Sequence, residues 1–123
     1  MKINLETLAN GLQSIRKLAQ LDLGNPKTNF KFMGVVASVE TEVKKYAELH
    51  NKIVEKYRDK SISEEIRIPL ENIEAFNKEA QEASVIEVEL DWDIIDCSID
   101  GLKGFTANDM KCLNGTFINI KAE

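Results

Sequence analysis

The clearest pattern along the chain is a helical repeat of apolar positions in residues 26–58. Apolar or weakly polar residues recur there at alternating spacings of four and three, at Phe32, Val36, Val39, Val43, Tyr46, His50, Ile53 and Tyr57. Asn25 and Pro26 open the segment, as helix-starting residues do. At 1.5 Å per residue the segment predicts one helix about 50 Å long. A seam sustained over several heptads indicates packing against other helices.

Two shorter helices are predicted on either side of the long one, over residues 5–21 with Asn4 as the cap, and over residues 69–83. Gly24 and Pro26 end the first helix and start the second, which makes a helical hairpin. Together the short helices nearly match the long one in length, so they can cover its seam within one chain. The alternative is a seam shared between subunits of a homo-oligomer, favoured by apolar residues off the seam, namely Phe30, Met33, Val35, Leu49 and Val54.

The period changes from helical to two after residue 85. Residues 86–90 alternate apolar and acidic side chains, which predicts a half-buried strand, and residues 116–120 are a second strand candidate. Between them, Thr106 and Asp109 are spaced as in a capping box that opens a short helix ending at Leu113. The sequence thus predicts an α+β fold, with a long helical hairpin plus a third helix, followed by a small antiparallel β element with a short helix.

Length and composition predict a single domain over residues 1–123, with a helical part at 1–84 and a small β-containing part at 85–123. No apolar run approaches the roughly 18 residues that span a bilayer, so we expect a cytoplasmic protein with no membrane partner. Cys97 and Cys112 lack a paired CxxC spacing and are expected to be reduced thiols.

The net charge of −5 is divided unevenly along the chain. Residues 1–60 hold eleven Lys and Arg against seven Asp and Glu, whereas residues 61–123 hold five against fourteen. This asymmetry fits self-association, an acidic face for a basic partner, or simply solvated helix faces. Neither half has the clustered Arg and Lys with interleaved aromatic residues that a nucleic-acid surface shows, so direct binding of nucleic acid is not expected.

No motif in the chain predicts catalysis or a cofactor. His50 is the only histidine and lies on the helical seam, which fits a packed residue better than a catalyst. The acids between Glu87 and Asp100 miss the spacing of a calcium loop, and no glycine-rich phosphate loop is present. We therefore expect a protein that is not an enzyme and that holds neither a metal nor a cofactor.

Two sets of residues are candidates for binding. The phosphate-binding candidates cluster around the turn between the first two helices, with solvated turn charges as the alternative, and are Arg16, Lys17, Lys27 and Lys31. The candidate interaction surface is aromatic and apolar, with closure of a small core as the alternative, and consists of Trp92, Phe105, Met110 and Phe117.

Five segments in order carry a family resemblance, namely Met1–Leu5, Ile53–Tyr57, Pro69–Glu79, Glu87–Leu90 and Phe105–Leu113. This order resembles a loosely defined family of uncharacterised small proteins encoded by tailed bacteriophages and prophages, especially those of Gram-positive hosts. The resemblance covers most of the chain and departs from the family at Trp92–Cys97.

The resemblance implies a phage accessory protein and supplies no catalytic residues. One hypothesis is a non-enzymatic protein that counters a host defence in the bacterial cytoplasm by sequestering a small signalling nucleotide or a host protein. The alternative is a structural or tail-assembly protein, such as a chaperone, that docks through the long helix. A nucleotide pocket requires convergent Lys and Arg, whereas a chaperone requires an exposed apolar groove.

Overall fold

A computed structural model gives the fold of the chain and describes residues 1–61 and 65–122. In chain order the elements are β1 (Lys2–Asn4), α1 (Leu5–Leu18), α2 (Pro26–Tyr57), α3 (Leu70–Ser84), β2 (Glu87–Glu89), β3 (Ile95–Ser98), the 3₁₀ helix η1 (Ile99–Gly101), α4 (Ala107–Leu113) and β4 (Ile118–Lys121). The predicted α+β class is confirmed. No helix of the described part of the chain is both long and apolar enough to cross a membrane.

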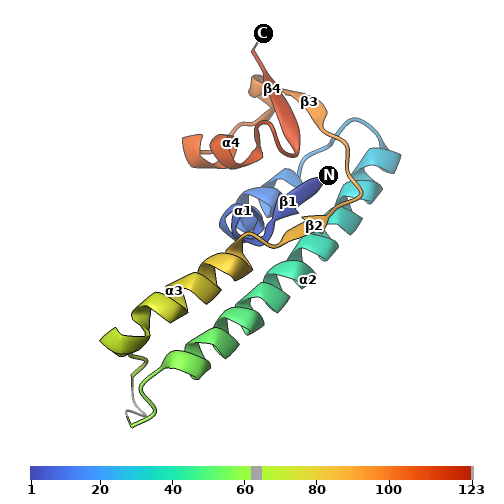
Figure 1. Cartoon of the computed structure of the whole chain (residues 1–123). Coiled ribbons are helices and arrows are strands. Elements are labelled where there is room, and N and C mark those ends of the chain that lie inside the picture. The colour runs from blue at the N-terminus through green and yellow to red at the C-terminus, as the bar shows by residue number, and fades with distance from the viewer. Residues whose placement is uncertain (62–64, 123) are drawn as a thin grey trace.

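The 32-residue helix α2 forms the long axis of the molecule, with α1 and α3 packed along it (Figure 1). Arg16 of α1 bonds Glu40 of α2 at 3.3 Å. Further along, the ring of Phe76 on α3 lies edge-on to His50 and Tyr57, with ring centroids 6.1 and 6.4 Å apart. Both short helices therefore cover the seam of α2 within one chain. Of the two arrangements predicted for the seam, the structure has the one inside a single chain.

Side-chain caps hold the starts of α1 and α2 where the sequence places them. The Asn4 side chain accepts from the Thr7 amide at 2.8 Å, and the Asn25 side chain accepts from the Thr28 amide at 2.9 Å. Each cap satisfies an amide that has no partner inside the helix. The first helix ends at Leu18, earlier than predicted.

The buried face of α2 differs from the predicted seam at two positions. Val35 is buried although it was predicted off the seam, and His50 is exposed although it was predicted on it. A straight helix has 3.6 residues per turn, so its buried face drifts by about 20° per heptad from a strict seven-residue repeat. The buried residues of α2 accordingly are Phe32, Val35, Val39 and Ile53.

The strands form two separate pairs. β1 pairs antiparallel with β2, with Ile3 opposite Val88, and β3 pairs parallel with β4, with Ile95 opposite Ile118. The two predicted strands therefore belong to different pairs, and each lies beside a strand that was not predicted. Parallel pairing is possible because η1 and α4 form the crossover between β3 and β4 (Figure 1).

One core joins the helical part to the β-containing part. The Phe32 ring of α2 lies edge-on to the rings of Trp92 and Phe117, with centroids 4.8 and 6.1 Å away. Around them pack further buried residues from both parts, including Leu8, Ile15, Leu18, Val39, Leu113 and Ile118. The two parts of the chain thus depend on each other for burial of their apolar side chains.

Candidate functional site

The first two predicted phosphate-binding cations are paired with carboxylates from other elements. Arg16 bonds Glu40, and Lys17 bonds Asp109 at 2.5 Å and the Gly104 carbonyl at 3.3 Å. Arg16 therefore faces α2, whereas Lys17 faces α4. A phosphate would have to displace a carboxylate from either side chain.

The other two cations lie near the start of α2. Lys31 is 3.6 Å from Asp91, an exposed residue after β2. Both Lys27 and Lys31 line a groove of about 570 Å³ between α2 and the segment Glu89–Asp91. Neither Arg16 nor Lys17 lines that groove, so the structure does not bring the four cations together.

The predicted aromatic surface is wrong for two of its residues, because they belong to the core. Trp92 is 4% exposed and Phe117 1%. The indole nitrogen of Trp92 donates to the Phe117 carbonyl at 2.9 Å, so the tryptophan gains a polar partner inside the core. Phe105 and Met110 are half-buried and pack against the same core. These residues therefore help to close the core, which was the alternative interpretation of their pattern in the sequence.

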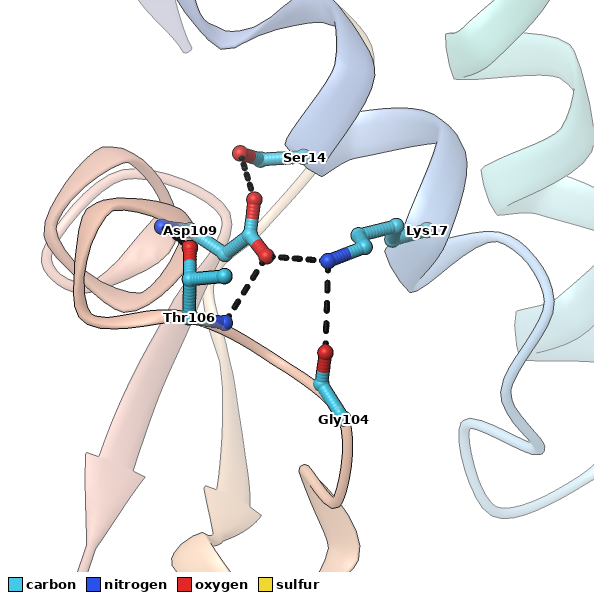
Figure 2. Close-up of polar contacts among 5 residues, drawn as sticks. All are labelled: Ser14, Lys17, Gly104, Thr106 and Asp109. Carbon is cyan, nitrogen blue, oxygen red and sulfur yellow. Dashed lines mark hydrogen bonds and ion pairs between the residues drawn. The ribbon is translucent and has the colours of Figure 1, made fainter.

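A polar cluster centred on the buried residues Ser14 and Asp109 joins α1 to the start of α4 (Figure 2). The Ser14 hydroxyl donates to one oxygen of Asp109 at 2.7 Å. The other oxygen accepts from the Lys17 ammonium and from the Thr106 amide, while the Asp109 amide donates to the Thr106 hydroxyl. The predicted capping box is thus confirmed, and its carboxylate also binds two side chains of α1. Lys17 additionally reaches the Gly104 carbonyl, just before the box.

The chemistry of this cluster is that of a structural clamp. The hydrogen bond from Lys17, then those from Ser14 and the Thr106 amide, hold the pKa of the Asp109 carboxyl well below its usual value. A carboxylate with a depressed pKa is a poor general base, because its efficiency depends on a pKa near the working pH. Ser14 is therefore not activated as a nucleophile.

Sequence reasoning found only half of this cluster. The spacing of Thr106 and Asp109 predicted the capping box, but nothing in it pointed to α1. Ser14 and Lys17 are three residues apart and so share one face of a helix. That polar pair, on a helix whose other inward positions are apolar, is the signal that could have indicated a buried acidic partner.

The Cys97 thiol is not an activated nucleophile. Burial, and to a smaller extent the nearby Asp96, raises the pKa of the Cys97 thiol. A raised pKa lowers the fraction of reactive thiolate. Both Cys97 and Cys112 are free and half-buried, as the sequence predicted for reduced thiols. Among the described residues, no group of three or more His, Cys, Asp or Glu is arranged to hold a metal.

A second cavity lies between the loop that follows α1 and the end of β3. Its volume is about 330 Å³, and its lining includes the carboxylates of Asp22 and Asp96 and the thiol of Cys97. No Lys or Arg is among its described lining residues. The cavity is therefore of a size for a small molecule but of the wrong charge for a phosphate group.

The segment from Ile86 to Asp100 is the most acidic surface of the molecule. It holds six carboxylates and no Lys or Arg, and all six acidic residues are exposed. Three isoleucines of the same segment, Ile86, Ile94 and Ile99, are 44%, 40% and 43% exposed. Leu90 and Trp92 anchor the segment to the core. Three of the six carboxylates have a cation partner, because Glu89 pairs with the N-terminal amine, Asp91 with Lys31 and Asp96 with Lys121. The segment is therefore fixed to the core and exposes acidic and apolar side chains, with Glu87, Asp93 and Asp100 as its carboxylates without an ion pair among the described residues.

No family model matches the chain, and no match was found among curated proteins or solved structures. A functional assignment therefore depends on the residues and their geometry.

Proposed function

We propose that this chain is a non-enzymatic phage accessory protein that counters a host defence by sequestering a host protein. The observation that carries the proposal is the exposed acidic and apolar segment Ile86–Asp100. Carboxylates attract a basic partner and steer its approach. Exposed isoleucines beside them supply the apolar contact that binding requires.

The charges favour a protein over a signalling nucleotide as the sequestered partner. Of the four cations that could hold a phosphate, Arg16, Lys17 and Lys31 each have a carboxylate partner. The cavity beside Cys97 is lined by carboxylates. Neither place offers the convergent cations that a nucleotide needs.

The proposed phage origin is supported by the resemblance of the order of segments in this sequence to small phage and prophage proteins. A phage protein of this kind would act in the cytoplasm of an infected or lysogenic bacterium. The chain would act there by occupying a basic surface that the host protein needs for its own function, which requires no chemistry from the chain itself.

To test the proposal, the chain is expressed in bacteria that carry one known defence. The plating efficiency of a phage that is restricted by this defence is then measured. The wild-type chain should raise the plating efficiency. A variant with Glu87→Gln, Asp93→Asn and Asp100→Asn should lose most of that effect, because it removes half of the acidic charge of the segment. The matched control is Glu6→Gln, Glu48→Gln and Glu71→Gln, which removes three exposed carboxylates outside the segment.

Equal activity of the two triple variants would contradict the proposal, because it would mean that the position of the acids does not matter. So would a lack of any effect on plating in hosts that carry different defences.

A second candidate, a tail-assembly protein, is favoured by the apolar outer face of α2. Phe30 is 78% and Met33 62% exposed, whereas the other large apolar residues of α2 are buried or half-buried. Removal of the gene from a phage genome would then lower the number of complete tails in a host without defences. The sequestration proposal expects normal particle numbers in that host.

A further inference from the structure

One stretch of the outer face of α2 has no charged residues. From Phe32 to Val39 the helix carries no charged residue, although Met33, Gly34, Ala37 and Ser38 are exposed. The C-terminal half of the same helix exposes Lys44, Lys45, Glu48, Lys52 and Glu55. Helix faces that stay in water are normally polar, so this stretch differs from a solvated surface.

Gly34 is at the centre of the uncharged stretch. Glycine in a helix interior is less stable than alanine. A β-carbon added at Gly34 would meet no atom of the chain within 4 Å, so packing inside the chain does not require a glycine there. With Ala37 and Ser38 it forms a shallow, small-residue surface that lets another backbone approach closely. Phe30 stands one turn before it.

We propose that this face binds a second copy of the chain, with the two α2 helices antiparallel about a two-fold axis at Gly34. Phe30 lies four residues before Gly34 and Ser38 four residues after it. The two-fold axis therefore places Phe30 of each copy against Ser38 of the other. Ser38 also lines the groove of about 570 Å³ beside α2, which provides space for the incoming ring.

The face complements itself in size and its central stretch carries no charge that a second copy would repel, which favours a second copy over an unrelated partner. It has a large residue, Phe30, on one side of Gly34 and small residues, Ala37 and Ser38, on the other. A two-fold interface requires such self-complementarity. Antiparallel helices keep the Lys27 side chains of the two copies about 20 Å apart at 1.5 Å per residue, whereas parallel helices would bring them together.

This dimer covers the edge of the groove at Glu89–Asp91 but not Glu87, Asp93 or Asp100, which do not line the groove. It does not depend on the sequestration proposed above. Sedimentation velocity over a range of concentrations tests it on the full chain. The wild type should sediment as a dimer. Phe30→Asp should weaken association at least about a hundredfold, since every dimer loses two buried rings. Ile99→Asp, at an exposed isoleucine elsewhere, should leave association unchanged.

Cross-linking tests the position of the axis independently. In a background of Cys97→Ser and Cys112→Ser, Gly34→Cys should form an interchain disulfide on mild oxidation, because the two cysteines meet at the axis. Glu48→Cys, on the same helix but about 40 Å from its symmetry mate at 1.5 Å per residue, should not.

Circular dichroism of Phe30→Asp should match that of the wild type, which separates loss of association from loss of folding. A monomeric wild type, a dimer that survives Phe30→Asp, or equal cross-linking at the two cysteine positions would overturn the proposal.

Discussion

Ser14 and Asp109 are 95 residues apart in the chain and are joined by a buried hydrogen bond of 2.7 Å. The bond connects the middle of α1 to the first turn of α4. Because the same carboxylate binds Lys17 and the Thr106 amide, one side chain fixes a helix start and a contact between helices. The replacement of Asp109 should therefore affect both.

The substitution Asp109→Asn should lower the melting temperature of the protein by several degrees. The amide keeps the shape of the carboxyl group but loses its charge, and with it the strong bond to Lys17. Thermal unfolding followed by circular dichroism measures the effect. Asp100→Asn, at an exposed acid of η1, is the control and should melt as the wild type does. Equal melting of the two variants would show that the clamp does not contribute to stability.

The same carboxyl group should make the stability depend on pH in the acidic range. The folded pKa of Asp109 is lowered from the ordinary value of 3.8 by its bonds to Lys17, Ser14 and Thr106. The unfolded state therefore binds a proton at a higher pH than the folded state does. The stabilisation is complete above about pH 4 and is lost as the pH falls further towards the folded pKa. Urea unfolding between pH 2 and 6 should show a steeper loss in the wild type than in Asp109→Asn; parallel curves would contradict this origin.

Trp92 is the only tryptophan of the chain, so its fluorescence reports on the core alone. The folded protein should emit at the short wavelengths of a buried indole and shift to longer ones on unfolding. Trp92→Phe should lower the free energy of unfolding by about 1–3 kcal/mol, because the smaller ring leaves a cavity and the Phe117 carbonyl loses the shorter of its two hydrogen bonds and keeps the one from the Ile95 amide. An emission maximum typical of a solvated indole in the native protein would be inconsistent with this core.

Phe76 should hold the end of the hairpin that is remote from the core. Its ring contacts His50 and Tyr57, and nearby Lys56 of α2 bonds Glu79 of α3 at 2.6 Å. Phe76→Ala should destabilise α3 by about 1–3 kcal/mol, less than for a fully buried ring. Hydrogen exchange should then rise in α3 and in the facing turns of α2. Equal acceleration in α1 would show that the hairpin end is not an independent unit.

The helices could be predicted from the sequence because their signals are local. Asn4, Asn25 and the pair Thr106 and Asp109 mark helix starts within a few residues of the groups that they cap. The apolar period of α2 likewise extends over many turns and is hard to miss. Its exact buried face was predicted less well, because the side of α2 that is covered depends on where α1 and α3 pack.

The strand partners and the core could not be predicted, because they depend on contacts between distant segments. β1 has three residues, too few for a period, and β3 begins among acids and isoleucines without clear alternation. Trp92 and Phe117 gave the same sequence signal as an exposed aromatic patch would. Only the position of Phe32, sixty residues before Trp92, places them inside.

The placement of Trp92 and Phe117 also sets an order of events during synthesis. Helices α1 and α2 leave the ribosome first, with Phe32 and Val39 still uncovered. Their apolar faces gain their full cover only after residue 118 has been made, since β4 completes the core. The nascent chain therefore exposes apolar surface until β4 has been made, in the period when chaperones and misassembly compete for it.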